Sequence, residues 1–548
     1  MNLKLKFCSS LAKVMPLTEP EITIRKGCAL RGERFSFQLA FSASDCAVKY
    51  LEADVESDLP VRKRKVALVP VENPSEVLDD DIISDQPGLY PDLLTDFDGG
   101  KYVSAPKGQW RSIWFTVDVP THCAPGVYPV KISLHNKYIL TEPIEKIFEI
   151  EVLDAIIPTQ KLKNTHWFYT DCLADYYNVP AFSEEHWKII YNYMKSAVDH
   201  GINMILTPVF TPALDTEVGG ERTTVQLIDV TLRQGKYKFG FERLERWIKL
   251  ARQAGIKYYE IPPLFTQWGS EFTPKIIAKV DGKTKRIFGW DVSSSSREYN
   301  KFLNAFLPAL VTFLKERKLQ KKFYFHCSDE PSEKHLETYK KCRSLMEKYL
   351  KGFTIMDALS HVEYFKQGIV TTPVPVESKL EEFIEAGMKD RWTYYCCGPS
   401  TVYCNRFIVM PSARNRIFGT LLYMYKVTGF LHWGFNFYNS QLSAFRIDPY
   451  RSTDSGGYFP AGDPFLVYPG KNGIPEDSIR AEVFYEALQD QRVLNKLEAL
   501  VGRETVEKAM NKLSPTGQMR MAEYPKGERS VLNVRATINR MLKKALEK

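Results

Sequence analysis

Two adjacent acidic residues end a short apolar run in the stretch KKFYFHCSDEP, Lys321 to Pro331. Asp329 and Glu330 could work as an acid–base pair, because neighbouring like charges raise the pKa of one member. They could equally begin a helix, since acids are favoured near a helix N-terminus. The two residue types alone leave both interpretations open.

The side chains that follow other apolar runs indicate which chemistry such a pair would serve. Aromatic rings stack on the flat apolar faces of sugars, amides and carboxylates bind hydroxyls, and no glycine-rich phosphate loop accompanies them. The set therefore predicts a carbohydrate site. We expect these side chains to contribute to it: Trp167, Asp171, Trp268, His326, Tyr394, Tyr395, Trp433 and Asn436.

Hydrolysis of a glycoside ordinarily needs two carboxylates, one on each side of the bond that breaks. The apolar run RWTYYCCGP ends in Cys396, Cys397 and Gly398 and offers no second carboxylate. Two neighbouring residues cannot readily flank a sugar from opposite faces. A 2-acetamido sugar removes this difficulty, because its own carbonyl oxygen attacks C1. One carboxylate then orients the acetamido N–H, and the other is the general acid and later the base.

The elements that would position the pair fall into three parts. Residues 1–155 contain short alternating runs such as RFSFQLAF and SIWFTVDV, separated by Gly, Pro and Asp turns, which predicts a β-sandwich. After a linker, residues 160–494 alternate strand-like and helix-like runs, and residues 495–548 predict a basic helical tail that packs on the barrel or contacts a partner.

About eight strand-like runs, each followed by a helix, predict a TIM (β/α)8 barrel. The active site of such a barrel lies at the C-terminal ends of its strands, and Asp329 and Glu330 end the fourth run. The eight runs are THWFYTDC, INMILTP, KYYEIPPL, KKFYFHCSDEP, FTIMDALS, VTTPVPV, RWTYYCCGP and FLHWGFNFY.

Composition narrows the class of protein. The net charge of +8 is mild for 548 residues, and the short basic clusters VRKRKV and KLQKK indicate solvated faces rather than a nucleic-acid site. We find neither a secretory apolar segment nor a run of about 18 apolar residues, so we expect a soluble, cytoplasmic protein that does not bind membranes.

The ten cysteines form no paired CxxC framework. Cys396, Cys397 and Cys404 cluster, but no histidine stands beside them at metal-ligand spacing, so we expect reduced thiols rather than a zinc site. We expect neither a metal nor a cofactor. The oligomeric state stays open.

Several stretches together resemble glycoside hydrolase family 123 and its uncharacterised relatives. They are FHCSDEP, THWFYTDCLADYY, LFTQW, GFLHWGFNFY and GDPFLVYPG, and the resemblance extends to about Leu494. It implies a β-sandwich followed by a barrel, and exo-acting β-N-acetylgalactosaminidase activity by substrate-assisted retention. It also implies that Asp329 orients the acetamido group and Glu330 is the acid/base. The substrate would be an oligosaccharide or glycoconjugate with a terminal β-linked 2-acetamido sugar.

The resemblance also implies roles for other side chains of the site. Trp268 and Trp433 match aromatic positions that stack on the sugar or belong to the core. A tyrosine hydroxyl holds the acetamido oxygen in such mechanisms, and Tyr394 or Tyr395, but not both, would serve, because successive side chains of a strand point to opposite faces. Asp171 and Asn436 are candidates for binding sugar hydroxyls or for capping turns. His326 is expected to fix the loop of the acidic pair.

Two alternatives remain. The first is a glycosidase for a sugar without a 2-acetamido group, with Asp171, Glu271 or Asp357 as the second carboxylate, because fold does not fix substrate. The second is a non-catalytic carbohydrate-binding protein that uses the sandwich as its binding module.

Overall fold

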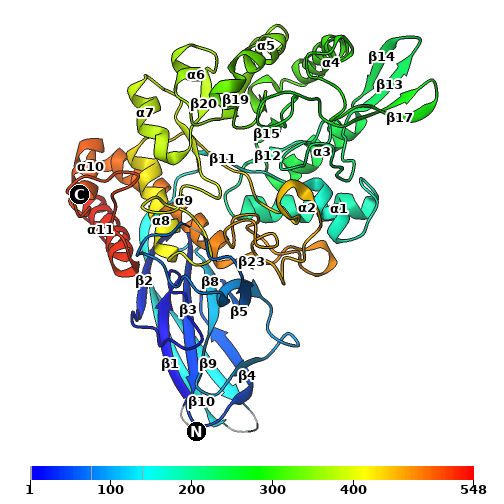
Figure 1. Cartoon of the computed structure of the whole chain (residues 1–548). Coiled ribbons are helices and arrows are strands. Elements are labelled where there is room, and N and C mark those ends of the chain that lie inside the picture. The colour runs from blue at the N-terminus through cyan, green and yellow to red at the C-terminus, as the bar shows by residue number, and fades with distance from the viewer. Residues whose placement is uncertain (1–2, 76, 137, 139, 548) are drawn as a thin grey trace.

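The computed structural model describes residues 3–75, 77–136, 138 and 140–547, and it shows a β-sandwich, a parallel barrel and C-terminal helices (Figure 1). The first sandwich sheet has the order β1-β3-β8-β5-β6-β23. Its strands are β1 (Leu3–Ser9), β3 (Arg34–Ala43), β8 (Trp110–Asp118), β5 (Val61–Val71), β6 (Gly88–Thr95) and β23 (Asp477–Ser478).

The second sheet of the sandwich has the order β2-β10-β9-β4-β7. Alternate residues of both sheets point inward, and the ring of Phe37 stacks on Phe148 at 4.0 Å and on Phe115 at 5.1 Å between centroids. This buried aromatic layer confirms the predicted sandwich. The strands are β2 (Lys26–Arg31), β10 (Leu140–Ile156), β9 (Gly126–Asn136), β4 (Val48–Glu56) and β7 (Val103–Ala105).

Eight parallel strands form the barrel, in the order β20-β19-β18-β15-β12-β11-β22-β21. A bridge between Val376 and Tyr394 brings the two outer strands together, and the Tyr394 amide donates to Pro375 O at 3.0 Å. The predicted barrel is therefore confirmed. Its strands are β11 (Lys163–His166), β12 (Met204–Leu206), β15 (Tyr258–Ile261), β18 (Phe323–Phe325), β19 (Thr354–Ala358), β20 (Thr372–Val374), β21 (Trp392–Tyr394) and β22 (Gly429–His432).

Helices surround the barrel, and serine side chains begin several of them. Ser183 accepts a hydrogen bond from the His186 amide at the start of α2, and Ser296 accepts one from the Tyr299 amide at the start of α4. The helices are α1 (Thr170–Tyr176), α2 (Glu184–Asp199), α3 (Glu242–Ala254), α4 (Arg297–Glu316), α5 (Leu336–Glu347), α6 (Glu363–Lys366), α7 (Leu380–Glu385), α8 (Ser412–Met424) and α9 (Ile479–Val501).

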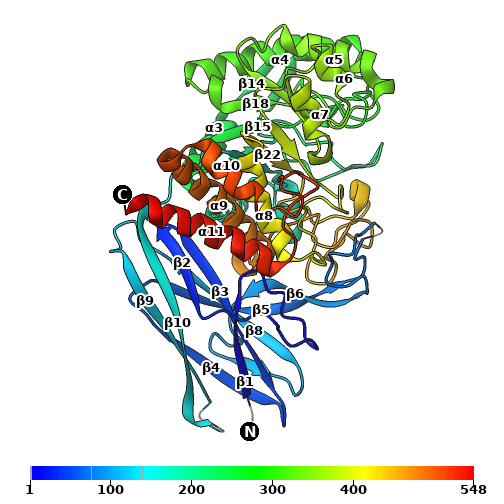
Figure 2. The same cartoon turned by 90° about the vertical axis from the view of Figure 1, so that its left-hand side faces the viewer.

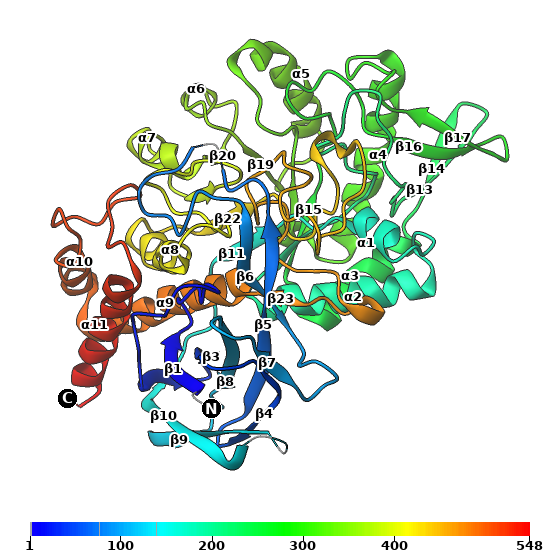
Figure 3. The ribbon, with the colours of Figure 1, turned by 60° about the horizontal axis from the view of Figure 1, so that its bottom comes forward.

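Two hairpins project from the barrel as a separate four-stranded sheet (Figures 1 and 3). Its order is β14-β13-β16-β17. The strands are β13 (Asp229–Arg233), β14 (Lys236–Gly240), β16 (Ile276–Val280) and β17 (Lys283–Phe288). We call residues 229–240 and 276–288 the flap.

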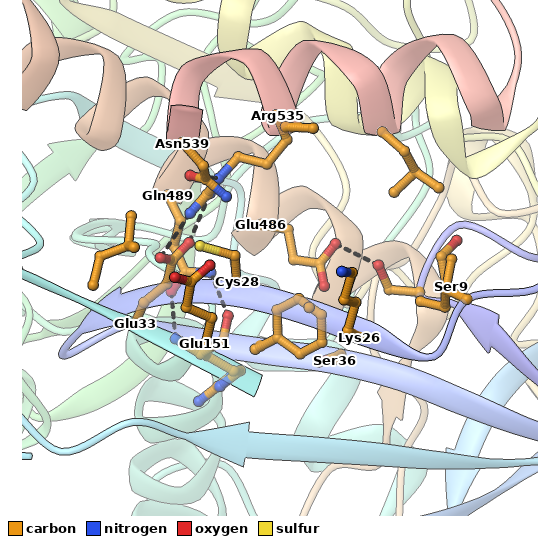
Figure 4. Close-up of a pocket in the computed structure, with 18 of the residues that line it drawn as sticks. Ser9, Lys26, Cys28, Glu33, Ser36, Glu151, Glu486, Gln489, Arg535 and Asn539 are labelled. Carbon is orange, nitrogen blue, oxygen red and sulfur yellow. Dashed lines mark hydrogen bonds and ion pairs between the residues drawn. The ribbon is translucent and has the colours of Figure 1, made fainter. Parts of the chain in front are cut away.

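The C-terminal helices α10 (Arg503–Asn511) and α11 (Glu528–Leu546) close the chain, and α11 lies across the junction of sandwich and barrel (Figure 2). Arg535 on α11 contacts Glu33 of the sandwich at 2.7 Å and Asp490 of α9 at 2.6 Å. A cavity of about 630 Å³ lies beneath α11, beside this network (Figure 4).

The helix α9 continues past the predicted boundary at Leu494 to Val501. None of the described helices is long and apolar enough to cross a membrane.

Candidate active site

Asp329 and Glu330 lie in the loop after β18, at the C-terminal end of the barrel. The Trp268 amide donates to Asp329 O at 3.0 Å, and the Glu330 amide donates to Ala358 O at 3.1 Å. The loop after β15 on one side and the end of β19 on the other therefore hold the pair. Glu330 has a φ of +42°, a left-handed conformation that costs free energy and persists where surroundings enforce it. The pair does not begin a helix, since α5 starts only at Leu336.

The pair opens into a cavity of about 190 Å³. This volume is smaller than the roughly 300–1,000 Å³ of pockets for drug-sized ligands, and it suits a single sugar unit. Aromatic rings form much of its wall. The lining residues are Trp167, Tyr169, Leu214, Asp215, Gln267, Trp268, Asp329, Glu330, Ala358, Tyr394, Cys396, Cys397, Leu431, Trp433, Gln441 and Phe459.

A tyrosine fixes the Glu330 carboxyl group. The Tyr394 hydroxyl donates to Glu330 Oε1 at 2.5 Å, and Ser360 Oγ lies 3.4 Å from the same hydroxyl. Burial, followed by the charge of Glu330, raises the pKa of Tyr394 well above its ordinary value, so Tyr394 stays protonated and remains a donor. This hydrogen bond leaves Glu330 Oε2 as the freer oxygen for proton transfer.

The surroundings of Asp329 disturb its protonation. Burial, followed by the charge of Glu330, raises the pKa of Asp329 well above its ordinary value, and the charge of His326 opposes that rise. A carboxyl group in this state binds a proton more readily than an exposed aspartate does. It becomes a better acceptor once a positively charged or N–H group of a substrate lies beside it.

His326 supplies a positive charge near Asp329. Its Nε2 lies 2.5 Å from Glu260 Oε1, and its Nδ1 lies 3.5 Å from Asp357 Oδ1. Burial alone would lower the pKa of His326, but the two carboxylates outweigh burial and raise it to about 10. The ring is therefore an imidazolium between two buried anions.

The two anions beside His326 also position the cavity wall. Glu260 accepts hydrogen bonds from Thr165 Oγ1 at 2.6 Å and from Trp167 Nε1 at 2.7 Å, which fixes the indole of Trp167. Asp357 accepts from the amides of Cys327 at 2.8 Å and Ser328 at 3.2 Å, immediately before the acidic pair. His326 and Asp357 thus support the site from outside the cavity.

Trp433 is fixed on another part of the wall. Its Nε1 donates to Asp463 Oδ2 at 2.8 Å, and His432 Nε2 lies 3.3 Å from Asp463 Oδ1. Burial raises the pKa of Asp463 to about 7, although Trp433 and Arg406 both act to lower it. The buried Arg406 also donates to His432 Nδ1 at 2.7 Å.

The structure brings Trp167, Trp268, Tyr394 and Trp433 together with the pair. The other predicted residues lie away from the cavity wall. Asp171 is buried in α1 and forms an ion pair of 2.7 Å with Arg222. The hydroxyl of Tyr395 is buried without a hydrogen-bond partner in the described part of the chain.

Asn436 also lies off the cavity wall, where it forms hydrogen bonds with the backbone. Its Oδ1 accepts from the Tyr169 amide at 2.9 Å, and its Nδ2 donates to Tyr169 O at 3.0 Å. This pair of hydrogen bonds joins the ends of the first and eighth strands. Glu271 is exposed and, like Asp357, is not part of the cavity wall.

Tyr169 and Asp215 line the cavity, although the sequence did not predict either of them as a site residue. The Tyr169 hydroxyl is buried without a hydrogen-bond partner among the described residues, and burial, with the nearby charges of Asp215 and Asp329, raises its pKa well above the ordinary value. Tyr169 lies between β11, which ends at His166, and α1, which begins at Thr170, so no regular pattern marked it. Asp215 stands in the irregular loop 207–228, where no pattern marked it.

Asp215 is a third carboxylate on the cavity wall. Its Oδ2 accepts from the Leu442 amide at 3.1 Å, and its own amide donates to Gln267 Oε1 at 2.6 Å. Burial raises the pKa of Asp215 to about 6, although that hydrogen bond to Leu442 lowers it. At neutral pH the group is therefore mostly an anion that can accept hydrogen bonds from hydroxyl groups.

One group in the described part of the chain has metal-ligand spacing, His200, Asp477 and Glu482, at the junction of sandwich and barrel. Arg64 already forms ion pairs with both Asp477 and Glu482, so this cluster is neutralised by arginine.

In the cavity, Cys396 and Cys397 are free thiols with 3.8 Å between their sulfur atoms.

Comparison with known proteins gives the family. The profile of the glycoside hydrolase 123 catalytic domain matches residues 167–497, more than half of the chain. The chain belongs to glycoside hydrolase family 123. It is thus a glycosidase, and the matched range contains the acidic pair and the whole wall of the cavity.

A solved family 123 glycoside hydrolase from Clostridium perfringens, studied for glycolipid glycan hydrolysis, has the same fold. It shares 15% sequence identity, with a TM-score of 0.74 over 100% of this chain and 98% of that one. A GH5 xyloglucanase from Bacteroides ovatus shares 8% identity over 85% of this chain and 98% of that one, but its TM-score of 0.28 carries no functional weight. A search of curated proteins found no significant match.

Proposed function

We propose that this family 123 glycosidase is an exo-acting β-N-acetylgalactosaminidase that uses the acetamido group of its substrate as the nucleophile. The observation that carries the proposal is that Asp329 and Glu330 share one loop and open into one small cavity. Adjacent carboxylates cannot stand on opposite faces of the same sugar ring, whereas a substrate-assisted reaction needs both on neighbouring sides of the acetamido group.

The proposed first step begins at Glu330. Its carboxyl group, held by Tyr394, protonates the glycosidic oxygen while the acetamido carbonyl oxygen attacks C1 and the C1–O bond breaks. The Asp329 carboxylate accepts a hydrogen bond from the acetamido N–H and balances the positive charge of the oxazolinium ion. In the second step Glu330 takes a proton from water, and the water oxygen attacks C1 from the side that the leaving group left. The bond between C1 and the acetamido oxygen breaks, which restores the acetamido group. The configuration at C1 is retained.

The buried Tyr169 hydroxyl is the best candidate to hold the acetamido oxygen. The two tyrosines predicted for this role are placed differently. The Tyr394 hydroxyl already donates a hydrogen bond to Glu330, and Tyr395 is not part of the cavity wall. The hydroxyl of Tyr169 has no hydrogen-bond partner among the described residues, and Asp329 lies close enough to affect its pKa. A substrate carbonyl would satisfy this donor.

Chromogenic β-glycosides of N-acetylgalactosamine, N-acetylglucosamine and galactose test the proposal. We expect turnover of the first to exceed that of galactoside by at least about 100-fold, because galactoside lacks the nucleophile. A thiazoline analogue of the acetamido sugar should compete with substrate. Equal turnover of the acetamido sugar and galactoside would contradict substrate assistance.

Asp215 favours a second candidate function, a glycosidase that uses two separated carboxylates. It lines the same cavity from the loop after β12, whereas the pair comes from the loop after β18. In that case Asp215→Asn would abolish turnover of galactoside, with Glu330 as the acid. If Asp215 only binds sugar hydroxyls, Asp215→Asn should raise KM and leave kcat within about threefold.

A further inference from the structure

The flap concentrates positive charge on two hairpins that follow loops of the catalytic cavity. Its 25 residues include seven lysines and arginines and two aspartates, a net charge of +5, whereas the whole chain of 548 residues carries +8. Both hairpins continue loops that line the cavity. Leu214 and Asp215 precede β13 in one loop, and Gln267 and Trp268 precede β16 in the other.

One face of the flap is apolar and packs on α4. Tyr237 stacks edge-on against Phe302 at 5.2 Å, and Phe239 packs against Phe306 at 5.4 Å between ring centroids. Side chains alternate between the two faces of a strand, so the neighbours of these aromatic residues point away from α4. The flap is thereby anchored on the barrel by one face and presents the other face to solvent.

The outward face carries four cations in register. Lys238 pairs with Thr231, and Thr231 pairs with Lys279 on the next strand, which places all three on one face. Arg233 pairs with Lys236 one step further along the same face. These four cationic side chains are exposed, and in the described part of the chain none of them forms an ion pair.

The acidic groups near this face form no ion pair with the four cations in the described part of the chain. Asp229 forms an ion pair with Arg243, and Glu221 contacts Lys275 and Arg286. Asp281 stands exposed in the turn between β16 and β17. Unpaired cations in one row attract a partner with repeated negative charge, and the attraction weakens as salt increases.

We propose that the outward face of the flap binds an anionic glycan, the continuation of a substrate whose terminal sugar occupies the cavity. Carboxylate or sulfate groups along such a glycan would pair with Arg233, Lys236, Lys238 and Lys279. The inference rests on the proposed exo-acting function, because it assigns the flap to the part of the substrate beyond the sugar that is removed.

Other polyanions fit the face less well. Tyr237 and Phe239 are turned toward α4, so the cationic face lacks exposed rings on which nucleic-acid bases stack. Within the 25 residues of the flap, all of which are described, no large apolar side chain is among the exposed ones. The face therefore has no anchor for insertion into a lipid surface.

Dextran sulfate and neutral dextran test the proposal directly. The flap variant is Lys236→Glu/Lys238→Glu/Lys279→Glu. The control variant makes the same change in net charge at three exposed lysines, one in α10, one directly after α10 and one in α11: Lys508→Glu/Lys512→Glu/Lys544→Glu. Binding is measured at low ionic strength by affinity electrophoresis, and hydrolysis of a small neutral chromogenic glycoside is measured in parallel.

We expect dextran sulfate, but not neutral dextran, to bind the wild-type protein, and we expect the flap variant to weaken binding by about tenfold or more. The control variant should change binding by less than about twofold, and all three proteins should hydrolyse the small substrate alike. Equal weakening in both variants, or wild-type binding to anionic vesicles or single-stranded DNA that is tighter than to dextran sulfate, would overturn the proposal. Flap-dependent binding without any N-acetylgalactosaminidase activity would instead uphold the binding face and refute the proposed function.

Discussion

The Tyr394 hydroxyl donates a hydrogen bond of 2.5 Å to Glu330 Oε1, and this contact joins the end of the seventh barrel strand to the acidic pair after the fourth. A hydrogen bond to a charged group contributes about 1.5–3 kcal/mol. We therefore expect Tyr394→Phe to lower kcat by about 10- to 100-fold. Tyr395→Phe is the matched control, because its hydroxyl is buried off the cavity wall, and it should leave kcat within about twofold. Equal losses in the two variants would show that the hydroxyl of Tyr394 has no special part in the reaction.

Glu330→Gln keeps the shape of the side chain and removes the proton donor. Loss of a general acid that also serves as base costs at least about 100- to 10,000-fold in turnover. The control is Glu337→Gln, which removes an exposed carboxylate whose one ion pair among the described residues is with Lys340 at 2.9 Å. Steady-state hydrolysis of N-acetylgalactosaminide measures both, and circular dichroism verifies the fold. A Glu330→Gln enzyme with near-wild-type kcat would remove Glu330 from the mechanism.

Asp329 should set the acidic limb of the pH profile. It must be ionised to balance the oxazolinium charge, and its pKa is raised by burial and by Glu330. Activity should therefore fall as the pH drops through that raised pKa, well above the ordinary range of an aspartate. His326→Gln removes a positive charge that lowers the pKa of Asp329, so the acidic limb should move to higher pH. The profile of kcat/KM against pH measures this, and an unmoved limb would contradict the assignment.

Trp268 should contribute to binding more than to stability. Its side chain is 47% exposed on the cavity rim, and its backbone has a left-handed φ of +56°. Trp268→Ala removes the ring with little loss of buried contact, so Tm should change by less than about 2 °C while KM rises about 5- to 20-fold. Calorimetry and steady-state kinetics separate the two effects. A large fall in Tm with unchanged KM would assign Trp268 to the core instead.

Arg535 should stabilise the junction of sandwich and barrel. Its guanidinium group contacts both Glu33 and Asp490, and its removal leaves two buried carboxylates with less compensation. Arg535→Met should lower the free energy of unfolding by about 3–5 kcal/mol. Arg540→Met on the exposed side of α11 is the control and should cost less than about 0.5 kcal/mol. Urea denaturation measures both, and equal stability of the two variants would contradict a role for the buried network.

The elements of this fold could be predicted from sequence because their signals are local. The alternation in RFSFQLAF corresponds to β3, and the alternation in SIWFTVDV corresponds to β8. The positions of single side chains were harder to predict. Asp171 was assigned to the cavity as if the first strand continued, but β11 ends at His166 and α1 begins at Thr170, so strand alternation no longer applies there.

Long-range relationships account for what the sequence left unpredicted. Asp215 reaches the cavity through contacts with Gln267 and Leu442, which lie 52 and 227 positions away along the chain. No local periodicity encodes such contacts. The pair itself could be predicted, because the end of a barrel strand is a position that the strand count alone identifies. The anion–imidazolium–anion arrangement of Glu260, His326 and Asp357 required the folded structure.

The two-residue strand β23 makes the sandwich depend on sequence that follows the barrel strands. Asp477 and Ser478 pair with Leu94 and Leu93 of β6, and Ser478 then caps α9. A gene fragment that stops before Asp477 would leave β6 with an open edge, and open edges promote aggregation. The sandwich is therefore not an independent cassette, and recombination that keeps its first sheet intact should carry β6 and β23 together.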